Sequence, residues 1–281
     1  MSLLKNPLVT QIISMALNED VGTGDITTET TIPADKTASG RFIAKEDMII
    51  CGIDVAELVF RTVDESISFN ANFKNGDKVC KGDVIATVNG NARNVLTAER
   101  TSLNLMQRLT GIATRTHEAV KCVEGTKAKI TDTRKTTPGL RVLEKYAVRA
   151  GGGTNHRFNL ADGILIKDNH IAVSGGIKNA VANARKAAPH TLKIEVEVET
   201  KEQLAQALEA GADIIMLDNM SNELMSECVK IIDGRALVEA SGNMGDKDLY
   251  EVAKTGVDII SIGALTHTVR AADISLKFKI D

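Results

Sequence analysis

The stretch LKIEVEVETKEQLAQALEAGADIIML, residues Leu192–Leu217, contains the repeating unit of the second half of the chain. Leu192–Val198 and Asp213–Leu217 carry the β-branched and apolar residues that are typical of buried strands. Between them, Lys201–Ala210 has the apolar spacing of a helix, and Gly211 follows where such a helix would end. A helix between two strands that are too apolar to be half-exposed predicts a parallel sheet.

The same alternation extends to both sides of this unit. Further strands are expected at Lys129–Thr133, Ile164–Lys167, Ala236–Ala240 and Asp258–Ile262. Further helices are expected at Ser174–Ala188, Asn222–Ile232 and Lys247–Thr255. Six strands in series predict an incomplete α/β (TIM-like) barrel, short of the full eight. A doubly wound open sheet is the alternative, although no G-x-G-x-x-G opens a helix after the first of these strands.

The first third of the chain has a different pattern, in which helices mix with short strands. Helices are expected at Pro7–Leu17, Asp54–Thr62 and Asn91–Val123, and strands within Ala38–Cys51 and Ser66–Val88. This mixture predicts an N-terminal α+β sandwich domain over residues 1–113, followed by the barrel over residues 114–269. Residues 270–281 are expected to return to the first domain.

Composition narrows the class of protein. The chain has 281 residues, 43% hydrophobic and 25% charged, which is typical of a soluble globular protein. A net charge of −3 and an aromatic content of 3% argue against a nucleic-acid partner. No apolar run is long enough for a membrane span or a signal peptide. The four cysteines are widely spaced, which indicates free thiols in a reducing cytoplasm rather than a metal site or a disulfide framework.

Polar residues gather at the carboxyl ends of the expected strands, where barrel enzymes hold their active sites. The first two ends are mostly cationic, with Arg134, Lys135 and Lys167, and the next two carry Glu197 and Asp218. The last two have small residues that would let backbone N–H groups approach an anion, namely Ser241, Gly242, Asn243, Ser261, Ile262 and Gly263. This order predicts a multiply anionic substrate, with phosphate at the last loops and sugar hydroxyls or Mg²⁺ at the carboxylates.

Two interpretations of the charged residues stay open. The cationic segment between the first two strands is either an anion-binding segment or a solvated loop. Three glutamates alternate with valine on one strand and are expected to face the barrel interior, namely Glu195, Glu197 and Glu199. Because buried carboxylates need neutralisation, an internal salt-bridge network is the alternative to a substrate site. His156 precedes Arg157 and is expected to donate a hydrogen bond within an anion pocket.

Several long motifs resemble those of one enzyme family. They are EDVGTGDITT, ERTSLNLMQRLTGIAT, DTRKTTPGLRVLEKYAVRAGGGTNHRFNL, LIKDNH, EVEVE, MLDN, EASGN and SIGALTHT. They run from residue 19 to residue 268, and the sequence resembles the quinolinate phosphoribosyltransferases, or nicotinate-nucleotide pyrophosphorylases (carboxylating). Thr110 stands where the family commonly has serine and Asn243 where it commonly has glycine, and neither difference removes a charged group.

The resemblance implies a reaction of NAD biosynthesis. Quinolinate and 5-phosphoribosyl-1-pyrophosphate (PRPP) would give nicotinate mononucleotide, pyrophosphate and CO₂, with Mg²⁺. It also implies a homodimer with its sites at the subunit interface, where Arg100 enters from the partner subunit. Association of dimers into a larger oligomer is left open.

The resemblance also implies roles for individual residues, carried over by match of motif. Quinolinate would be held by Arg134, His156, Arg157 and Lys167, within a substrate-binding set that includes Thr133. Lys135 would lie between the two substrates, and Glu197 and Asp218 would hold the ribose and its Mg²⁺. The 5′-phosphate would lie against Ser241, Gly242, Asn243, Ser261, Ile262 and Gly263. The catalytic set would be Lys135, Lys167, Glu197 and Asp218.

Two other functions remain as alternatives. A barrel lyase would use Lys167 as a Schiff-base nucleophile, since a lysine at a strand end can serve in that way. A non-catalytic relative would keep the fold without the reaction, although retention of the full cationic set argues against it.

Overall fold

The computed structural model describes residues 5–278, which divide into two compact units. The first unit combines residues 5–117, 137–152 and 269–278, and the second combines residues 118–136 and 153–268. The expected boundary at residue 113 falls inside one helix, α4 (Ala92–Cys122). The segment 137–152, which lies within the expected barrel range, groups with the first unit. Residues 279–281, expected to return to the first domain, lie outside the described residues.

The first unit is built on an antiparallel sheet with strand order β12-β1-β5-β3. The sheet strands are β1 (Thr37–Ala44), β3 (Ser68–Ala71), β5 (Val84–Asn91) and β12 (Ile274–Phe278). A separate two-stranded ladder joins β2 (Met48–Ile49) to β4 (Lys78–Val79). Strands far apart in the chain therefore pair in this unit, since Gly40 of β1 lies opposite Phe278 of β12.

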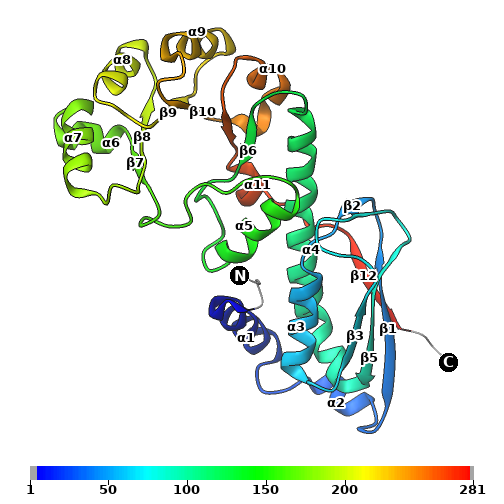
Figure 1. Cartoon of the computed structure of the whole chain (residues 1–281). Helices are drawn as coiled ribbons and strands as arrows, with labels where there is room; N and C mark the ends of the chain where they lie inside the picture. Colours follow the sequence, from blue (N-terminus) through cyan, green and yellow to red (C-terminus); the bar gives the residue numbers. More distant parts are fainter. Residues whose placement is uncertain (1–4, 279–281) are drawn as a thin grey trace. The chain divides into compact units, whose positions relative to one another are not determined.

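Helices complete the first unit (Figure 1). They are α1 (Pro7–Val21), α2 (Ile26–Thr31), α3 (Ile53–Val63), most of α4, and α5 (Arg141–Ala150). The rings of Phe42 on β1, Phe60 on α3 and Phe69 on β3 lie 5.8 to 6.0 Å apart, so α3 packs on one face of the sheet. This helix-on-sheet arrangement is the α+β architecture that the sequence predicts.

The second unit is a parallel sheet with strand order β6-β11-β10-β9-β8-β7. Its strands are β6 (Lys129–Thr131), β7 (Ile164–Ile166), β8 (Ile194–Val198), β9 (Ile214–Asp218), β10 (Leu237–Ser241) and β11 (Ile259–Ser261). Within the described residues, the edge strands β6 and β7 do not pair with each other. The prediction of an incomplete α/β barrel, rather than a doubly wound sheet, is therefore confirmed.

Helices connect these strands, as the amphipathic spacing predicts. They are α6 (Asp168–Ser174), α7 (Ile177–Ala187), α8 (Lys201–Glu209), α9 (Asn222–Ile232), α10 (Leu249–Lys254), α11 (Ala264–His267) and the short 3₁₀ turn η2 (Met244–Asp246). Gly211, Gly234 and Gly256 follow α8, α9 and α10 with positive φ angles of 75°, 71° and 92°. A left-handed residue ends a helix most readily when it is glycine.

None of the helices in residues 5–278, including the 31-residue α4, is long and apolar enough to cross a membrane.

Candidate active site

A cavity of about 400 Å³ lies at the carboxyl ends of the parallel strands of the second unit. It gathers most of the residues that the sequence singles out, namely Thr133, Arg134, Lys135, His156, Arg157, Lys167, Glu197, Asp218, Ser241, Gly242, Asn243 and Ser261. Leu165, Met216, Asn219 and Glu239 complete the lining. Residues separated by more than one hundred positions thus share one cavity because most of them follow, or lie in, a strand of the same sheet.

Asp132 fixes the segment that carries His156 and Arg157. The Asp132 carboxylate is fully buried and accepts hydrogen bonds from the Asn155 side chain at 2.6 Å and from the His156 backbone N–H at 2.9 Å. The Thr154 backbone N–H donates to the carbonyl of Ile130 on β6 at 2.8 Å. The segment therefore lies along the free edge of β6, in an extended register that holds both side chains at the cavity.

The cavity is lined by both cationic and anionic side chains. Lys167 forms an ion pair with Glu197, and Arg157 donates from its guanidinium to the carbonyl of Gly163 at 2.8 Å. Desolvation by burial, and then the charge of Arg134, lower the pKa of Arg157. Two guanidinium groups close enough to repel each other are stabilised when an anion binds between them. The ion pair with Glu197 would have to break before Lys167 could serve as a Schiff-base amine.

The loops after β9 and β10 meet at very short range. Gly242 has φ of +90°, and a Cβ atom placed there would lie 2.3 Å from the Asn219 side-chain oxygen. Asn219 and Asn243 also have positive φ angles, of 54° and 52°. Asparagine tolerates this left-handed region better than most residues, which explains why Asn243 can stand where glycine is common. The result is a close-packed loop whose backbone is accessible to an anion.

The loop after β11 holds Lys135 rather than lining the cavity with all of its expected residues. The Thr266 hydroxyl donates to the carbonyl of Lys135 at 2.9 Å, and a Cβ atom at Gly263 would lie 3.0 Å from the Lys135 side chain. Ser261 lines the cavity, Ile262 is buried, and neither Ile262 nor Gly263 is among the lining residues. Glycine at position 263 thus leaves room for the lysine stem.

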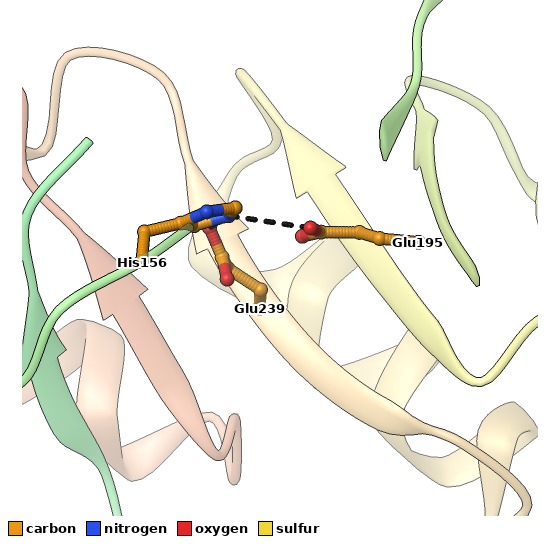
Figure 2. Close-up of side chains that lie close together, drawn as sticks. All are labelled: His156, Glu195 and Glu239. Atoms are coloured by element: carbon orange, nitrogen blue, oxygen red, sulfur yellow. Dashed lines mark ion pairs between the residues drawn. The ribbon is translucent and has the colours of Figure 1, made fainter. Parts of the chain in front are cut away.

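The side chains of His156, Glu195 and Glu239 lie close together in a cluster (Figure 2), and His156 and Glu239 also line the cavity. The His156 Nε2 atom lies 3.2 Å from the Glu195 carboxylate and 3.7 Å from that of Glu239. The Arg157 backbone N–H donates to His156 Nδ1 at 2.8 Å. Because both ring nitrogens have partners in the chain, a hydrogen bond from His156 to a substrate stays a prediction. It would require Nε2 to turn away from Glu195.

Glu239 is the residue that sequence reasoning missed. Desolvation by burial, and then the charge of Glu195, raise the pKa of Glu239 to about 8. The one signal in the sequence is a single glutamate inside the apolar run Leu237–Ala240.

The three glutamates in and just after β8 have different surroundings. Glu195 is buried against His156, Glu197 pairs with Lys167, and Glu199 is exposed. Part of the salt-bridge network that the sequence left as an alternative is therefore present within the cavity itself.

Some predicted cations lie elsewhere. Arg100 is exposed on α4 in the first unit and lines a separate cavity with Asp20, Asp25 and Thr97. Arg141 and Arg149, which the cationic segment also contains, belong to α5 of the first unit and do not line the 400 Å³ cavity.

Comparisons with known proteins agree on one family. Models of the N-terminal and C-terminal domains of quinolinate phosphoribosyl transferase match residues 25–110 and 112–277. A probable nicotinate-nucleotide pyrophosphorylase [carboxylating] from Bacillus subtilis is 49% identical over 92% of this chain and 89% of its own length. A mitochondrial quinolinate phosphoribosyltransferase [decarboxylating] from Nicotiana glauca is 44% identical over 95% of this chain and 81% of its own length.

A solved structure supports the same relationship. The nicotinate-nucleotide pyrophosphorylase from Francisella tularensis has a TM-score of 0.94 and 43% identity, and the match covers 99% of each chain. Matches of this length include both units and every lining residue of the cavity. The chain therefore belongs to the quinolinate phosphoribosyltransferase family.

Proposed function

We propose that this chain transfers the phosphoribosyl group of PRPP to quinolinate with loss of CO₂, giving nicotinate mononucleotide and pyrophosphate. The observation that carries the proposal is one cavity that joins Arg134, Arg157 and Lys167 to the loop Ser241–Asn243, in a chain of this family. Quinolinate needs cations for its two carboxylates. The sugar phosphate needs accessible backbone N–H groups, which the loop supplies.

Charge repulsion is the first obstacle to this reaction. Two like charges 4 Å apart near a protein surface repel by about 4 kcal/mol, and the two substrates together bring several negative charges into contact. The guanidinium groups of Arg134 and Arg157 offset this cost, and their planar donors also orient a carboxylate. The mutual repulsion of these two groups is relieved by the same anion, so binding is favoured twice.

The transfer step passes through a positively charged sugar. Displacement at an anomeric carbon has oxocarbenium character, which the carboxylates of Glu197 and Asp218 stabilise. Lys167, paired with Glu197, links the pyridine side of the cavity to the ribose side. After transfer the ring nitrogen is positive, and it stabilises the electron pair that remains on the adjacent carbon when CO₂ leaves. The decarboxylation thus needs no separate organic cofactor.

Glu197 and Asp218 also fit Mg²⁺, which we propose as the metal cofactor. Both offer carboxylate oxygens at the cavity, and each has one partner there, the Lys167 ammonium and the Asn219 side-chain amide. Two carboxylates supply fewer ligands than Mg²⁺ takes, which suits an ion that is completed by water and by substrate phosphate oxygens. When bound, Mg²⁺ would neutralise charge on the departing pyrophosphate.

We further propose a homodimer in which Arg100 serves the partner's site. Arg100 is exposed and does not line the cavity of the second unit. Helices α1 and α2 expose large apolar side chains at Leu8, Met15 and Ile26, and such patches are typical of interfaces.

We also propose a cytoplasmic location, because Cys51, Cys80, Cys122 and Cys228 are all free thiols in the structure.

The direct test supplies quinolinate, PRPP and Mg²⁺ to the purified protein and measures nicotinate mononucleotide and CO₂. Product and CO₂ in equal amounts support the proposal. Equal turnover of nicotinate, which has one carboxylate fewer, contradicts the assignment of the dicarboxylate as substrate.

Replacement of one cavity arginine tests how the substrate is held. Arg134→Ala removes a charged donor from the cavity, and we expect kcat/KM for quinolinate to fall about 100-fold, equivalent to about 3 kcal/mol. Lys178→Ala is the matched control, since Lys178 is a surface cation that pairs with Glu209 outside the cavity. Unchanged turnover in Arg134→Ala, with circular dichroism as in the wild type, would refute the role of Arg134.

A further inference from the structure

A second cavity, of about 580 Å³, lies at the opposite end of the barrel. Its lining includes Ile164, Ile214 and Ile259, which are the first residues of β7, β9 and β11. His156, Arg157 and Glu239 line both this cavity and the one at the carboxyl ends of the strands. Each end of the barrel therefore has its own cavity. The cluster of His156, Glu195 and Glu239 lies between the two.

Contacts within the chain orient the His156 ring in this cluster. The Arg157 backbone N–H lies 2.8 Å from His156 Nδ1, and Nε2 faces Glu195 at 3.2 Å. The charge of His156 lowers the pKa of Glu239, but burial and the charge of Glu195 raise it by more. Glu195 and Glu239 are 4% and 2% exposed, and among the described residues one oxygen of each has no hydrogen-bond partner. Two ionised carboxylates in this position would be very costly.

One proton on the pair removes that cost, and the surroundings favour Glu239 as its carrier. Glu195 faces the His156 Nε2 atom at 3.2 Å and the charge of Arg157. Glu239 faces Glu195, the more distant His156 and the neutral hydroxyl of Ser261. Burial and the Glu195 charge both raise the pKa of Glu239, in agreement with this assignment.

We propose that Glu239 is the acid that protonates the pyridine ring carbon after CO₂ has left, and that the second cavity resupplies its proton from water. The inference rests on the proposed function. Among the described residues, Glu239 is the one carboxyl group that lines both cavities.

The proposed step transfers a proton from Glu239 to the ring carbon. Cleavage of the bond between the ring and the carboxylate releases CO₂ and leaves an electron pair on the ring carbon. That pair takes the proton of Glu239, so a C–H bond forms as the O–H bond breaks. The resulting Glu239 carboxylate then takes a proton from water in the second cavity, and hydroxide returns to solvent.

The test separates the two halves of the reaction in a single turnover. Glu239→Gln keeps the shape of the side chain but removes the acidic proton. We expect pyrophosphate to be released at the wild-type rate, while nicotinate mononucleotide forms at least about 100-fold more slowly. The ribosylated dicarboxylate should accumulate. Glu239→Asp should restore part of the second rate, and Glu199→Gln, at an exposed position just beyond the same strand as Glu195, should match the wild type.

Several outcomes would overturn the inference. A structural role would slow pyrophosphate release and product formation equally. Nicotinate mononucleotide formed at the wild-type rate by Glu239→Gln would exclude Glu239 as the acid. Stoichiometric divalent metal in the purified protein, lost in Glu239→Gln, would show that a metal ion rather than a proton neutralises the pair. The wild-type protein gives a test without a variant, since absence of a solvent deuterium isotope effect on the second phase would also overturn the inference.

Failure of the proposed function would give a different result from failure of the Glu239 inference. If the proposed function is wrong, the wild-type protein itself forms no nicotinate mononucleotide from quinolinate and PRPP.

Discussion

The charge state of a single buried residue, Glu239, links the stability of the second unit to pH. Its carboxyl group lies between Glu195 and the hydroxyl of Ser261, with almost no exposure to water. Because burial favours the neutral form, the folded protein holds a proton that the unfolded chain releases at much lower pH. Proton binding and folding are therefore coupled at this residue.

We expect the free energy of unfolding to fall as pH rises from about 4.5 to about 8, because the pKa of Glu239 rises from 4.5 in the unfolded chain to about 8 in the fold. The contribution is complete below pH 4.5 and is lost as the folded group ionises. The slope from this group is at most about 1.4 kcal/mol per pH unit. Urea denaturation of the wild type and Glu239→Gln measures it, since glutamine removes the titrating group. Parallel pH dependence of the two proteins would contradict the assignment.

Individual cations of the cavity could be predicted from sequence, whereas the roles of the buried acids Asp132 and Glu239 could not. Arg134, Lys135 and Lys167 follow apolar runs, and the carboxyl ends of parallel strands meet at one edge of a sheet. Asp132 and Glu239 carry no such pattern, because one acid inside an apolar run is equally compatible with a capped turn or an ion pair. Their roles depend on what faces them across the barrel, which only the fold determines.

Among the structural elements, the loop after β10 carries the tightest steric constraint in the cavity. Gly242 approaches both the side chain and the backbone nitrogen of Asn219, in a conformation that side chains rarely adopt. Asn243 is also left-handed but is exposed, so its side chain meets less restriction. One position in this loop therefore requires glycine and the next accepts asparagine.

We expect Gly242→Ala to destabilise the protein by about 1 to 3 kcal/mol and to weaken PRPP binding more than tenfold, because the added methyl displaces Asn219. Thermal unfolding and isothermal titration measure the two effects. Gly211→Ala is the matched control, with a positive φ of 75° but no atom within 4 Å of the added carbon, and should show backbone strain without loss of binding. Asn243→Gly should leave PRPP affinity unchanged. Equal loss in all three variants would show that steric contact with Asn219 is not the cause.

Helices were predicted best where their apolar spacing is regular. The ranges of α8 and α9 were predicted within one residue, whereas α5 and α6 were missed. Helix α5 lies inside a cationic stretch, and its buried face includes the charged residues Glu144 and Lys145 beside Leu143, Ala147 and Val148. Arg108 neutralises Glu144 through two short hydrogen bonds, at 2.6 and 2.9 Å. Burial of charged residues hides the periodicity on which a helix prediction depends.

At the scale of the whole molecule, the proposed dimer would build each reaction site from two subunits. A two-fold symmetric dimer would give each site Arg134 from one subunit and Arg100 from the other. Arg100 does not line either cavity of the second unit in its own chain. This is consistent with a dimer in which Arg100 serves the partner's site.

Mixed dimers test this arrangement. Arg100→Ala and Arg134→Ala should each be inactive alone, whereas a heterodimer of the two should show about half of wild-type activity, since one of its two sites has both arginines. Differently tagged subunits allow the heterodimer to be purified before assay. A heterodimer of Lys178→Ala with wild type controls for the exchange procedure. No recovery in verified heterodimers would count against a shared site.

The pairing of β12 with β1 has a consequence for biosynthesis. Gly40 and Phe278 lie opposite each other on paired strands, yet the whole barrel is encoded between them. A ribosome must therefore translate the whole second unit before β12, an edge strand of the first sheet, can pair with β1. Until then β1 presents an unpaired edge, which is open to wrong partners during synthesis.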